Sequence, residues 1–263
     1  MIQFFSRPDA YFGLCGDLRC SVSGHRISNA PEFMRGLRLA FVSDVHALPR
    51  TTDADLDALA ERIRETEPDI LLLGGDYADT AAPCRRFLKR VGKIPVRYGI
   101  FAAVGNNDRE AFPDLPVLRR AASDAGIQLL VNESRTIHVG NGRLIIAGLD
   151  EYRHGHPDPA GLYPESASDS LYRVLISHFP RGLAPMPDLM LSGHTHGGQF
   201  NAFGITPYTV GFERVFKRRG SPRFIAGMHA CRGGTVLVSK GIGASRVPMR
   251  VCVRPEIDVV VFT

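Results

Sequence analysis

Short apolar runs alternate with amphipathic stretches between residues 37 and 108. The apolar runs lie at 37–44, 69–76 and 96–108, and the amphipathic stretches lie at 51–68 and 84–94. In the first amphipathic stretch Leu56, Leu59 and Ile63 recur at helical spacing, with Thr51 or Thr52 as the expected N-cap. Continuous apolar strands that alternate with helices predict βα units whose strands are buried on both faces.

Beyond residue 127 the pattern becomes strand-rich, with one helical segment expected near Ala167–Tyr172. Strands are predicted at 127–131, 135–140, 143–150, 174–180, 187–198, 234–243 and 256–263. No internal repeat or Gly/Ser-rich linker divides the chain, so we expect one domain over residues 1–263, with two mixed sheets packed face to face and helices outside. Residues 1–36, with YFGLCG and LRCSVSG as two arms, predict a lead-in hairpin.

Composition is that of an ordinary globular protein, since 44% of the residues are hydrophobic and 22% are charged. A disordered, collagen-like or coiled-coil protein is therefore excluded. The formal charge of +5 permits anionic partners without requiring them. Five scattered cysteines without a CxxC motif argue against a disulfide framework or a zinc ribbon. Because the sequence has no secretory leader and no apolar run of spanning length, we expect a cytoplasmic protein.

Polar residues that can bind metal ions follow five of the apolar runs, each time at the carboxyl end of the run. They are Asp44 and His46, Asp76 and Asp79, Asn106 to Asp108, His178, and His194 and His196. In open α/β sheets ligands bind beyond the carboxyl ends of the strands, so the five clusters are expected to converge on one site.

Spacing and chemistry both favour a metal site over five unrelated turns. Residues i and i+2 of a strand point to the same side, so a DxH or HxH pair can reach one ion together. Histidine nitrogen with carboxylate and amide oxygen suits Zn, Fe or Mn, and the lack of thiolate argues against a structural zinc site. A single histidine at a strand end is usually structural, but five such clusters in order are hard to explain in that way.

The motifs SDVH, GGDYAD, GNND, SHFP and GHTH follow one another between Asp44 and His196. Their order resembles that of the calcineurin-like metallophosphoesterases, whose pattern is DxH, GDxxD, GNH[DE], a lone His and GHxH. The strings GHTHGGQ, SKGIGAS and RPEI are similar to a bacterial branch that acts on phosphodiesters or lipid-linked substrates. The resemblance implies a four-layer αββα sandwich that binds two divalent metal ions.

The resemblance also implies a ligand set in which Asp76 bridges the two ions. The first ion would take Asp44, His46, Asp76 and His196, and the second would take Asp76, Asn106, His178 and His194. Two such ions can share a hydroxide and clamp the phosphoryl oxygens. Manganese is expected, with iron or zinc as alternatives. Asp79 is expected to orient a histidine ligand from behind.

Asn107 departs from the family pattern, which has His at this position. That His is thought to assist the phosphoryl group or to protonate the leaving oxygen, with the following acid, Asp108, orienting it. Asn107 can donate a hydrogen bond but cannot act as a general acid. Either the leaving group has a low pKa, or another residue supplies the proton. The candidates for such a donor are His154, His156 and His229.

Residues 199–224 combine basic and aromatic side chains next to the predicted phosphate site. The basic residues are Arg214, Lys217, Arg218, Arg219 and Arg223. This segment predicts a substrate lid or a contact with an anionic membrane, with a solvated basic loop as the alternative. Tyr77 and His154 are further candidates for substrate contact, with packing and a polar loop as their respective alternatives. No sequence signature for specific nucleic-acid binding is present.

The sequence thus predicts a dinuclear phosphohydrolase in which a metal-bridging hydroxide attacks a phosphodiester or pyrophosphate, lipid-linked or nucleotide-linked. The expected catalytic residues are Asp76, Asn107 and Asp108. Alternatives are a phosphomonoesterase or protein phosphatase, and a metal-binding scaffold whose catalysis is weakened by Asn107. The presence of all seven ligand positions favours the enzyme, because a scaffold gains little from seven clustered polar residues.

Overall fold

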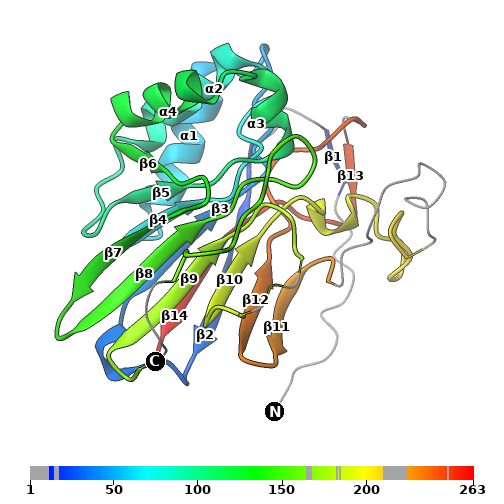
Figure 1. Cartoon of the computed structure of the whole chain (residues 1–263). Helices are drawn as coiled ribbons and strands as arrows, with labels where there is room; N and C mark the ends of the chain where they lie inside the picture. Colours follow the sequence, from blue (N-terminus) through cyan, green and yellow to red (C-terminus); the bar gives the residue numbers. More distant parts are fainter. Residues whose placement is uncertain are drawn as a thin grey trace.

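The computed structural model describes residues 18–163, 168–181, 183, 185–209, 224–247 and 249–263, and the backbone of 12–14. Within these ranges two six-stranded sheets pack face to face (Figure 1). The first sheet has the order β2 (Ser21–Ile27), β14 (Glu256–Phe262), β3 (Arg38–Val42), β4 (Ile70–Leu73), β5 (Ile100–Ala102), β6 (Ile127–Leu129). The second has the order β11 (Gly227–Cys231), β12 (Gly234–Val238), β10 (Leu189–Ser192), β9 (Leu171–Ile176), β8 (Gly142–Gly148), β7 (Glu133–Val139).

Both sheets are mixed, as the sequence predicted. Strands β3, β4, β5 and β6 are parallel, and β14 joins them antiparallel to β3. Strands β8, β9, β10 and β12 are also parallel, with the antiparallel strands β7 and β11 at the two edges. The parallel strands are buried almost throughout, which explains why they appear in the sequence as continuous apolar runs.

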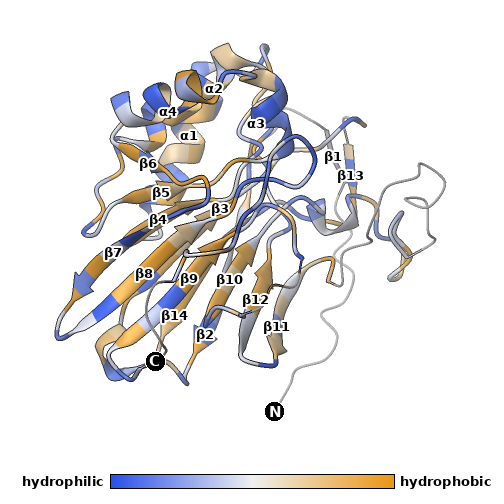
Figure 2. Cartoon of the chain, viewed as in Figure 1, coloured by the Kyte–Doolittle hydropathy of each residue, from blue (hydrophilic) through white to orange (hydrophobic). Residues whose placement is uncertain are grey.

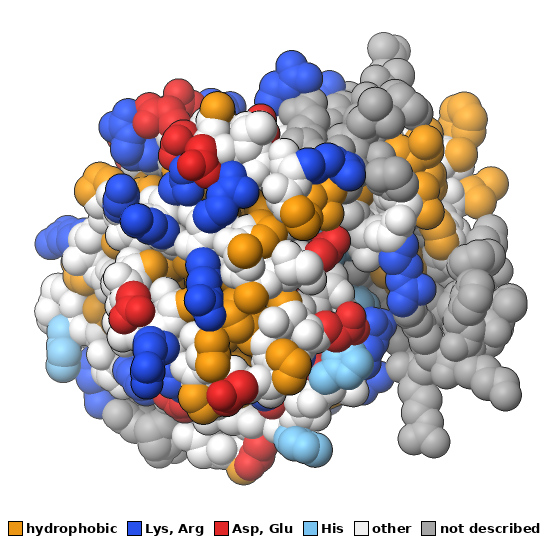
Figure 3. Space-filling model, turned by 90° about the horizontal axis from the view of Figure 1, so that it is seen from above, with side chains coloured by type: hydrophobic (Ala, Val, Ile, Leu, Met, Phe, Trp, Pro, Cys, Tyr) orange, Lys and Arg blue, Asp and Glu red, His pale blue; other side chains and the backbone are white. Residues whose placement is uncertain are grey.

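Helices α1 (Asp53–Arg64), α2 (Ala81–Val91) and α4 (Leu115–Asp124) cover the outer face of the first sheet (Figure 1). Leu56 of α1, Phe87 of α2 and Leu118 of α4 share a buried cluster with the facing strands. The Thr52 hydroxyl accepts from Asp55 N while Asp55 accepts from Thr52 N, so Thr52 is the N-cap of α1. The face seen in Figure 3 carries charged side chains of both signs.

The space between the sheets is filled by a second apolar cluster, which includes Phe41, Leu72, Ile146 and Leu191. Figure 2 shows this segregation, with hydrophobic strands inside and hydrophilic loops at the rim. On the outer face of the second sheet, a smaller described cluster contains Leu162 and Met190, with loop side chains packed against it. The predicted pair of mixed sheets with flanking helices is confirmed.

Two predicted elements differ in the structure. The arms of the lead-in hairpin do not pair with each other, because β1 (Phe12–Leu14) pairs with β13 (Met249–Val251) and β2 pairs with β14. The segment Ala167–Tyr172 does not form the expected helix in its described part, since β9 begins at Leu171 beside β8 and β10. Pairing with distant strands outweighs the local pattern in both cases.

No helix in the described ranges is long and apolar enough to cross a membrane. Among the described cysteines, Cys84, Cys231 and Cys252 are free thiols.

Candidate metal centre

The predicted ligands follow strands whose carboxyl ends meet at one edge of the two sheets. Asp44 follows β3, Asp76 follows β4, Asn106 follows β5, His178 follows β9 and His194 follows β10. All five clusters predicted from the sequence are therefore brought to one place.

The backbone of the centre is unusual, because five of its non-glycine residues have positive φ angles. They are Asp44 (53°), His46 (44°), Asp76 (55°), His194 (69°) and His196 (52°). Such a conformation costs a side-chain-bearing residue about 1 kcal/mol or more and persists only where the surrounding structure enforces it. Strain of this kind concentrates at functional sites, and here it lies in the ligand loops.

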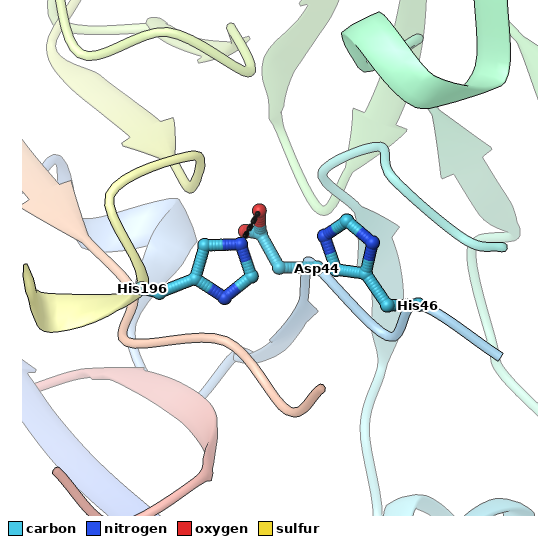
Figure 4. Close-up of side chains that lie close together, drawn as sticks. All are labelled: Asp44, His46 and His196. Atoms are coloured by element: carbon cyan, nitrogen blue, oxygen red, sulfur yellow. Dashed lines mark ion pairs between the residues drawn. The ribbon is translucent and has the colours of Figure 1, made fainter. Parts of the chain in front are cut away.

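Asp44, His46 and His196 form the first group of possible ligands, and their side chains point toward one another (Figure 4). His196 Nε2 lies 3.4 Å from Asp44 Oδ1, and the rings of His46 and His196 are 5.0 Å apart between centroids. All three residues are buried. One ligand atom from each lies within 4.8 Å of the others, a separation that one ion could bridge.

Asp76, His178 and His194 form the second group. His178 Nε2 lies 3.3 Å from Asp76 Oδ2, and His194 Nδ1 lies 3.3 Å from His178 Nε2. The same Asp76 oxygen lies 3.6 Å from His46 Nε2, which belongs to the first group. Asp76 therefore lies between the two groups, and its role as a bridging ligand stays a prediction.

Two buried atoms at the centre, His46 Nε2 and Asn106 Oδ1, have no hydrogen-bond partner within the described residues. Buried polar atoms are nearly always paired, so such orphans need an explanation. Asn106 Nδ2 donates to Asn107 Oδ1 at 3.1 Å, and this hydrogen bond sets the orientation of the Asn106 amide. The Asn106 side-chain oxygen is then the amide atom without a partner in the described residues. A nitrogen lone pair and an amide oxygen left over beside two carboxylates fit a divalent cation.

The pKa shifts of His194 and His196 agree with this fit. Burial and neighbouring imidazoles lower the pKa values of His194 and His196 well below the usual range, so both offer neutral nitrogens. Burial disfavours a charge on His178, but the Asp76 carboxylate outweighs it and raises the His178 pKa to about 10. Burial likewise opposes ionisation of Asp76, yet the surrounding imidazoles hold its pKa below the usual range. The position beside Asp76 therefore favours positive charge.

The second ring nitrogen of three histidines is held from behind, which directs the other nitrogen inward. His46 Nδ1 lies 2.9 Å from Asp79 Oδ1, which is the contact expected for Asp79. His178 Nδ1 lies 2.8 Å from the Gly74 carbonyl oxygen. His196 Nδ1 is 3.2 Å from the Gly243 carbonyl oxygen.

Asn107 and Asp108 occupy different positions at the centre. Asn107 Nδ2 lies 3.1 Å from Asp76 Oδ2 and 3.2 Å from His46 Nδ1, so its amide faces the ligands. The Asp108 carboxylate accepts from the backbone amides of Gly105, Asp76 and Tyr77. Burial and the nearby Asp76 charge raise the pKa of Asp108 to about 7. Within the described residues its hydrogen bonds join two loops and do not orient the Asn107 side chain.

Tyr77 does not face the centre, contrary to its predicted contact with substrate. Its side chain is buried, its ring stacks on Phe87, and its hydroxyl donates to the carbonyl oxygens of Leu73 and Ala103. The residue that follows Asp76 in the GDxxD motif thus turns into the helix layer and packs there.

A cavity of about 570 Å³ opens beside the centre. Its base includes Asp76, Asn106, Asn107, His194 and His196, and its walls include Arg153, Phe200, Pro207, Tyr208, Arg246 and Val247. Phe200, Pro207 and Tyr208 belong to the segment 199–224 that the sequence predicted as a substrate lid or membrane contact, whereas Arg153, Arg246 and Val247 were not predicted. A buried arginine, Arg250, was also missed. It donates to the carbonyl oxygens of Lys240 and Gly243, and its Nη2 lies 3.1 Å from His196 Nδ1.

The three candidate proton donors do not line this cavity. His154 is exposed and lies 3.0 Å from Glu110, whose side chain does line it. His156 belongs to the same loop, and the only groups of possible metal ligands in the described ranges are the two at the centre. His229 stacks on Phe224 and contacts the Ala226 carbonyl oxygen. The basic residues Arg214, Lys217, Arg218 and Arg219 lie outside the described residues.

Two mixed sheets with two groups of histidine and carboxylate ligands at their shared edge define a metal-dependent hydrolase. The chain belongs to the calcineurin-like phosphoesterase family, whose model matches residues 37–198, more than half of its length. It is therefore a metal-dependent phosphoesterase, and its family binds two divalent metal ions.

Relatives in several organisms share this domain. The chain is 28% identical to YkuE, an uncharacterised metallophosphoesterase of Bacillus subtilis, over 87% of this chain and 80% of the relative. It is also 28% identical to the phosphodiesterase YaeI of Escherichia coli, over 89% of this chain and 84% of the relative. A dimetal phosphatase from Danio rerio is a structural neighbour at 10% identity, with a TM-score of 0.49 over 79% of this chain and 88% of the other.

Proposed function

We propose that the protein hydrolyses a P–O bond of a phosphodiester or pyrophosphate whose leaving group departs without receiving a proton from the enzyme. The observation that carries the proposal is the position of the Asn107 amide, between Asp76 and His46 at the base of the cavity. An amide there can donate to a phosphoryl oxygen but cannot act as a general acid. A phosphate or aryl oxide has a pKa low enough to leave without such an acid.

The two groups of side chains would each hold one divalent ion, and Asp76 would reach both. Asp44, His46, Asp76 and His196 would hold the first, and Asp76, Asn106, His178 and His194 would hold the second. Bound ions would supply Lewis acidity toward the phosphoryl oxygens and a hydroxide nucleophile. The nitrogen and oxygen donor set suits manganese, which we propose as the resident metal, and is also compatible with iron or zinc.

Hydrogen bonds within the chain position the side chains that would contact a bound phosphoryl group. The Asn107 backbone N–H donates to Asp76 Oδ1 at 2.8 Å, which orients the carboxylate between the two groups. Asp79 holds His46 from behind, and Asp108 locks the loop of Asp76 to the loop of Asn107. The Asn107 side chain lies beside Asp76 and His46, where its amide could donate to a phosphoryl oxygen.

The cavity argues for a small or extended substrate and against a protein phosphatase. A volume of about 570 Å³ accommodates an organic group of ordinary ligand size. Arg153 and Arg246 offer positive charge for a second phosphate, while Phe200 and Tyr208 offer apolar surface. A nucleotide-linked or lipid-linked diester fits such walls. The cytoplasmic location expected from the sequence stays a prediction.

The decisive experiment measures phosphoester hydrolysis by metal-reconstituted protein. Substrates are bis-nitrophenyl phosphate, nitrophenyl phosphate and a UDP-linked or CDP-linked lipid, with and without manganese. We expect metal-dependent turnover of the diesters, with the monoester slower, and loss of turnover in Asp76→Asn. Faster turnover of the monoester would favour a phosphomonoesterase. If none of the three substrates is hydrolysed in the presence of metal, the result would favour a metal-binding scaffold whose catalysis is weakened by Asn107.

Asn107→His tests the leaving-group argument directly. An imidazole at this position can protonate a departing oxygen, a contribution of about 10²–10⁴ where an acid is needed. We expect turnover of an alkyl phosphodiester to rise by at least tenfold, and turnover of bis-nitrophenyl phosphate to change by less than about threefold. Equal gains on the two substrates would refute the argument.

A further inference from the structure

The described surface carries an apolar projection near the mouth of the cavity. Phe203 is 91% exposed and Ile205 is 60% exposed, more than any other large apolar side chain in the described residues. Hydrophobic side chains protrude at the right-hand edge of Figure 3, the side where Figure 1 places the chain that follows His196. Scattered apolar residues on a surface are common, so the exposure alone decides nothing.

The backbone of this projection is a well-formed tight hairpin. Ala202 and Ile205 exchange two backbone hydrogen bonds of 3.1 and 2.9 Å, and Gly204 N donates to Asn201 Oδ1. Phe203 and Gly204 have φ angles of 54° and 86°, the left-handed pair that defines a type I′ turn. Asn, Asp or Gly usually fills the first of these positions. A bulky phenyl side chain there is held out in solvent at a backbone cost, although it adds nothing to the core.

The projection continues the apolar wall of the cavity. Phe200 and Pro207, which flank the hairpin in sequence, both line the cavity, and so does the exposed Val247. Gln199 ties the two segments together, because its side chain donates to the Val247 carbonyl oxygen and accepts from Ser245 N. The hairpin therefore projects from a segment whose two ends, Phe200 and Pro207, line the cavity beside the candidate metal centre.

Positive charge lies at the base of this apolar surface. Arg246 is exposed, lines the cavity and is the neighbour of Val247. The whole chain carries a formal charge of +5. Apolar side chains at a tip with cations behind them are typical of segments that lie in a membrane interface, where the apolar groups enter the acyl boundary and the cations meet anionic headgroups.

We infer that the hairpin Ala202–Ile205 docks on an anionic lipid bilayer through Phe203 and Ile205, so that the cavity faces the headgroup layer. The docking itself does not depend on the proposed chemistry, because neither side chain lines the cavity. For the enzyme, it would bring a lipid-linked phosphoester to the metal centre by a path within the interface.

Vesicle sedimentation tests this inference. Metal-loaded protein is mixed with vesicles of phosphatidylcholine alone or with 30% phosphatidylglycerol. We expect binding to the anionic vesicles that weakens as salt is raised. The double variant F203S/I205S should bind at least tenfold more weakly. The matched control V22S/V117S removes two exposed valines on β2 and α4, and should bind like the wild type.

Three outcomes would overturn the inference. The first is absence of wild-type binding to anionic vesicles, and the second is equal binding by wild type and F203S/I205S. The third is a wild-type dimer in gel filtration that F203S/I205S converts to monomer, without vesicle binding, since a second copy of the chain would then cover the hairpin. Turnover of bis-nitrophenyl phosphate should be the same in F203S/I205S and wild type. A wild type that lacks this turnover would refute the proposed function and leave the vesicle result intact.

Discussion

A buried ion pair ties the helix that carries Asn107 to the second sheet, and its removal gives a quantitative test of the structure. Arg109 of α3 (Asn106–Ala111) donates from Nη2 to Asp150 Oδ2 at 2.5 Å and from Nε to Oδ1 at 3.2 Å. Each Asp150 oxygen also accepts one backbone N–H, from Glu151 at 2.8 Å and from His156 at 2.9 Å. Asp150 follows β8 and is almost completely buried.

Asp150→Asn cannot preserve this arrangement in either orientation of the new amide. Both carboxylate oxygens face one guanidinium N–H and one backbone N–H, so the new NH₂ group must face two donors. A charge-assisted hydrogen bond worth about 1.5–3 kcal/mol and a neutral one worth about 0.5–1.5 kcal/mol are lost. We expect the free energy of unfolding to fall by about 3 kcal/mol, close to the cost of breaking a buried ion pair.

Urea unfolding at a fixed metal concentration measures this loss, because bound metal would otherwise shift the apparent stability. Glu61→Gln is the control, since the Glu61–Arg64 pair on α1 is exposed and its loss should leave the free energy of unfolding almost unchanged. A double-mutant cycle with Arg109→Met should give a coupling energy of about 1–3 kcal/mol for Asp150. A loss below about 1 kcal/mol in Asp150→Asn, or no coupling, would show that the pair does not anchor α3.

Three further changes test the centre itself. Tyr77→Phe should lower the free energy of unfolding by about 1 kcal/mol through two lost hydrogen bonds, with KM unchanged; a raised KM would restore the substrate-stacking interpretation. Gly105→Ala would place a Cβ 2.1 Å from Asp76 Oδ1, so we expect calorimetric metal affinity to drop sharply, and unaltered affinity would contradict the close contact. Asp79→Asn weakens the contact behind His46 and should reduce metal affinity by about 10–100-fold in the same titration. A variant that binds metal as tightly as the wild type would show that Asp79 does not position His46.

The parts of the fold that were predictable from the sequence are those where local pattern and burial coincide. The parallel strands β3, β4 and β5 are buried on both faces and read as apolar runs. Strand pairing was less predictable, since Phe12 pairs with Val251 across almost the whole chain. Helix α4, at 115–124, was not predicted, and its segment has a proline in the first turn, two adjacent arginines and only two fully buried residues, Leu118 and Ala122.

At the centre, the sequence indicated which residues meet but not how they meet. The strand argument expected His194 and His196 to point to one side and reach one ion. In the structure both lie beyond the end of β10 with positive φ angles, and they join different groups of ligands. Only the resemblance implied this division. Residue spacing along a strand does not apply once the chain leaves the sheet.

The strained ligand loops are held by contacts that do not depend on a metal ion. The Asp108 carboxylate accepts three backbone N–H groups from two loops, and a Cβ on Gly75 would lie 2.4 Å from Gly105 N, so the loops pack too closely for larger residues. Together with the hydrogen bonds behind His46, His178 and His196, these contacts orient the side chains of the candidate centre. The cost of the left-handed residues is met by the fold around them. Under the proposed function, the same contacts would hold the Asn107 amide beside Asp76 when a phosphoester enters the cavity.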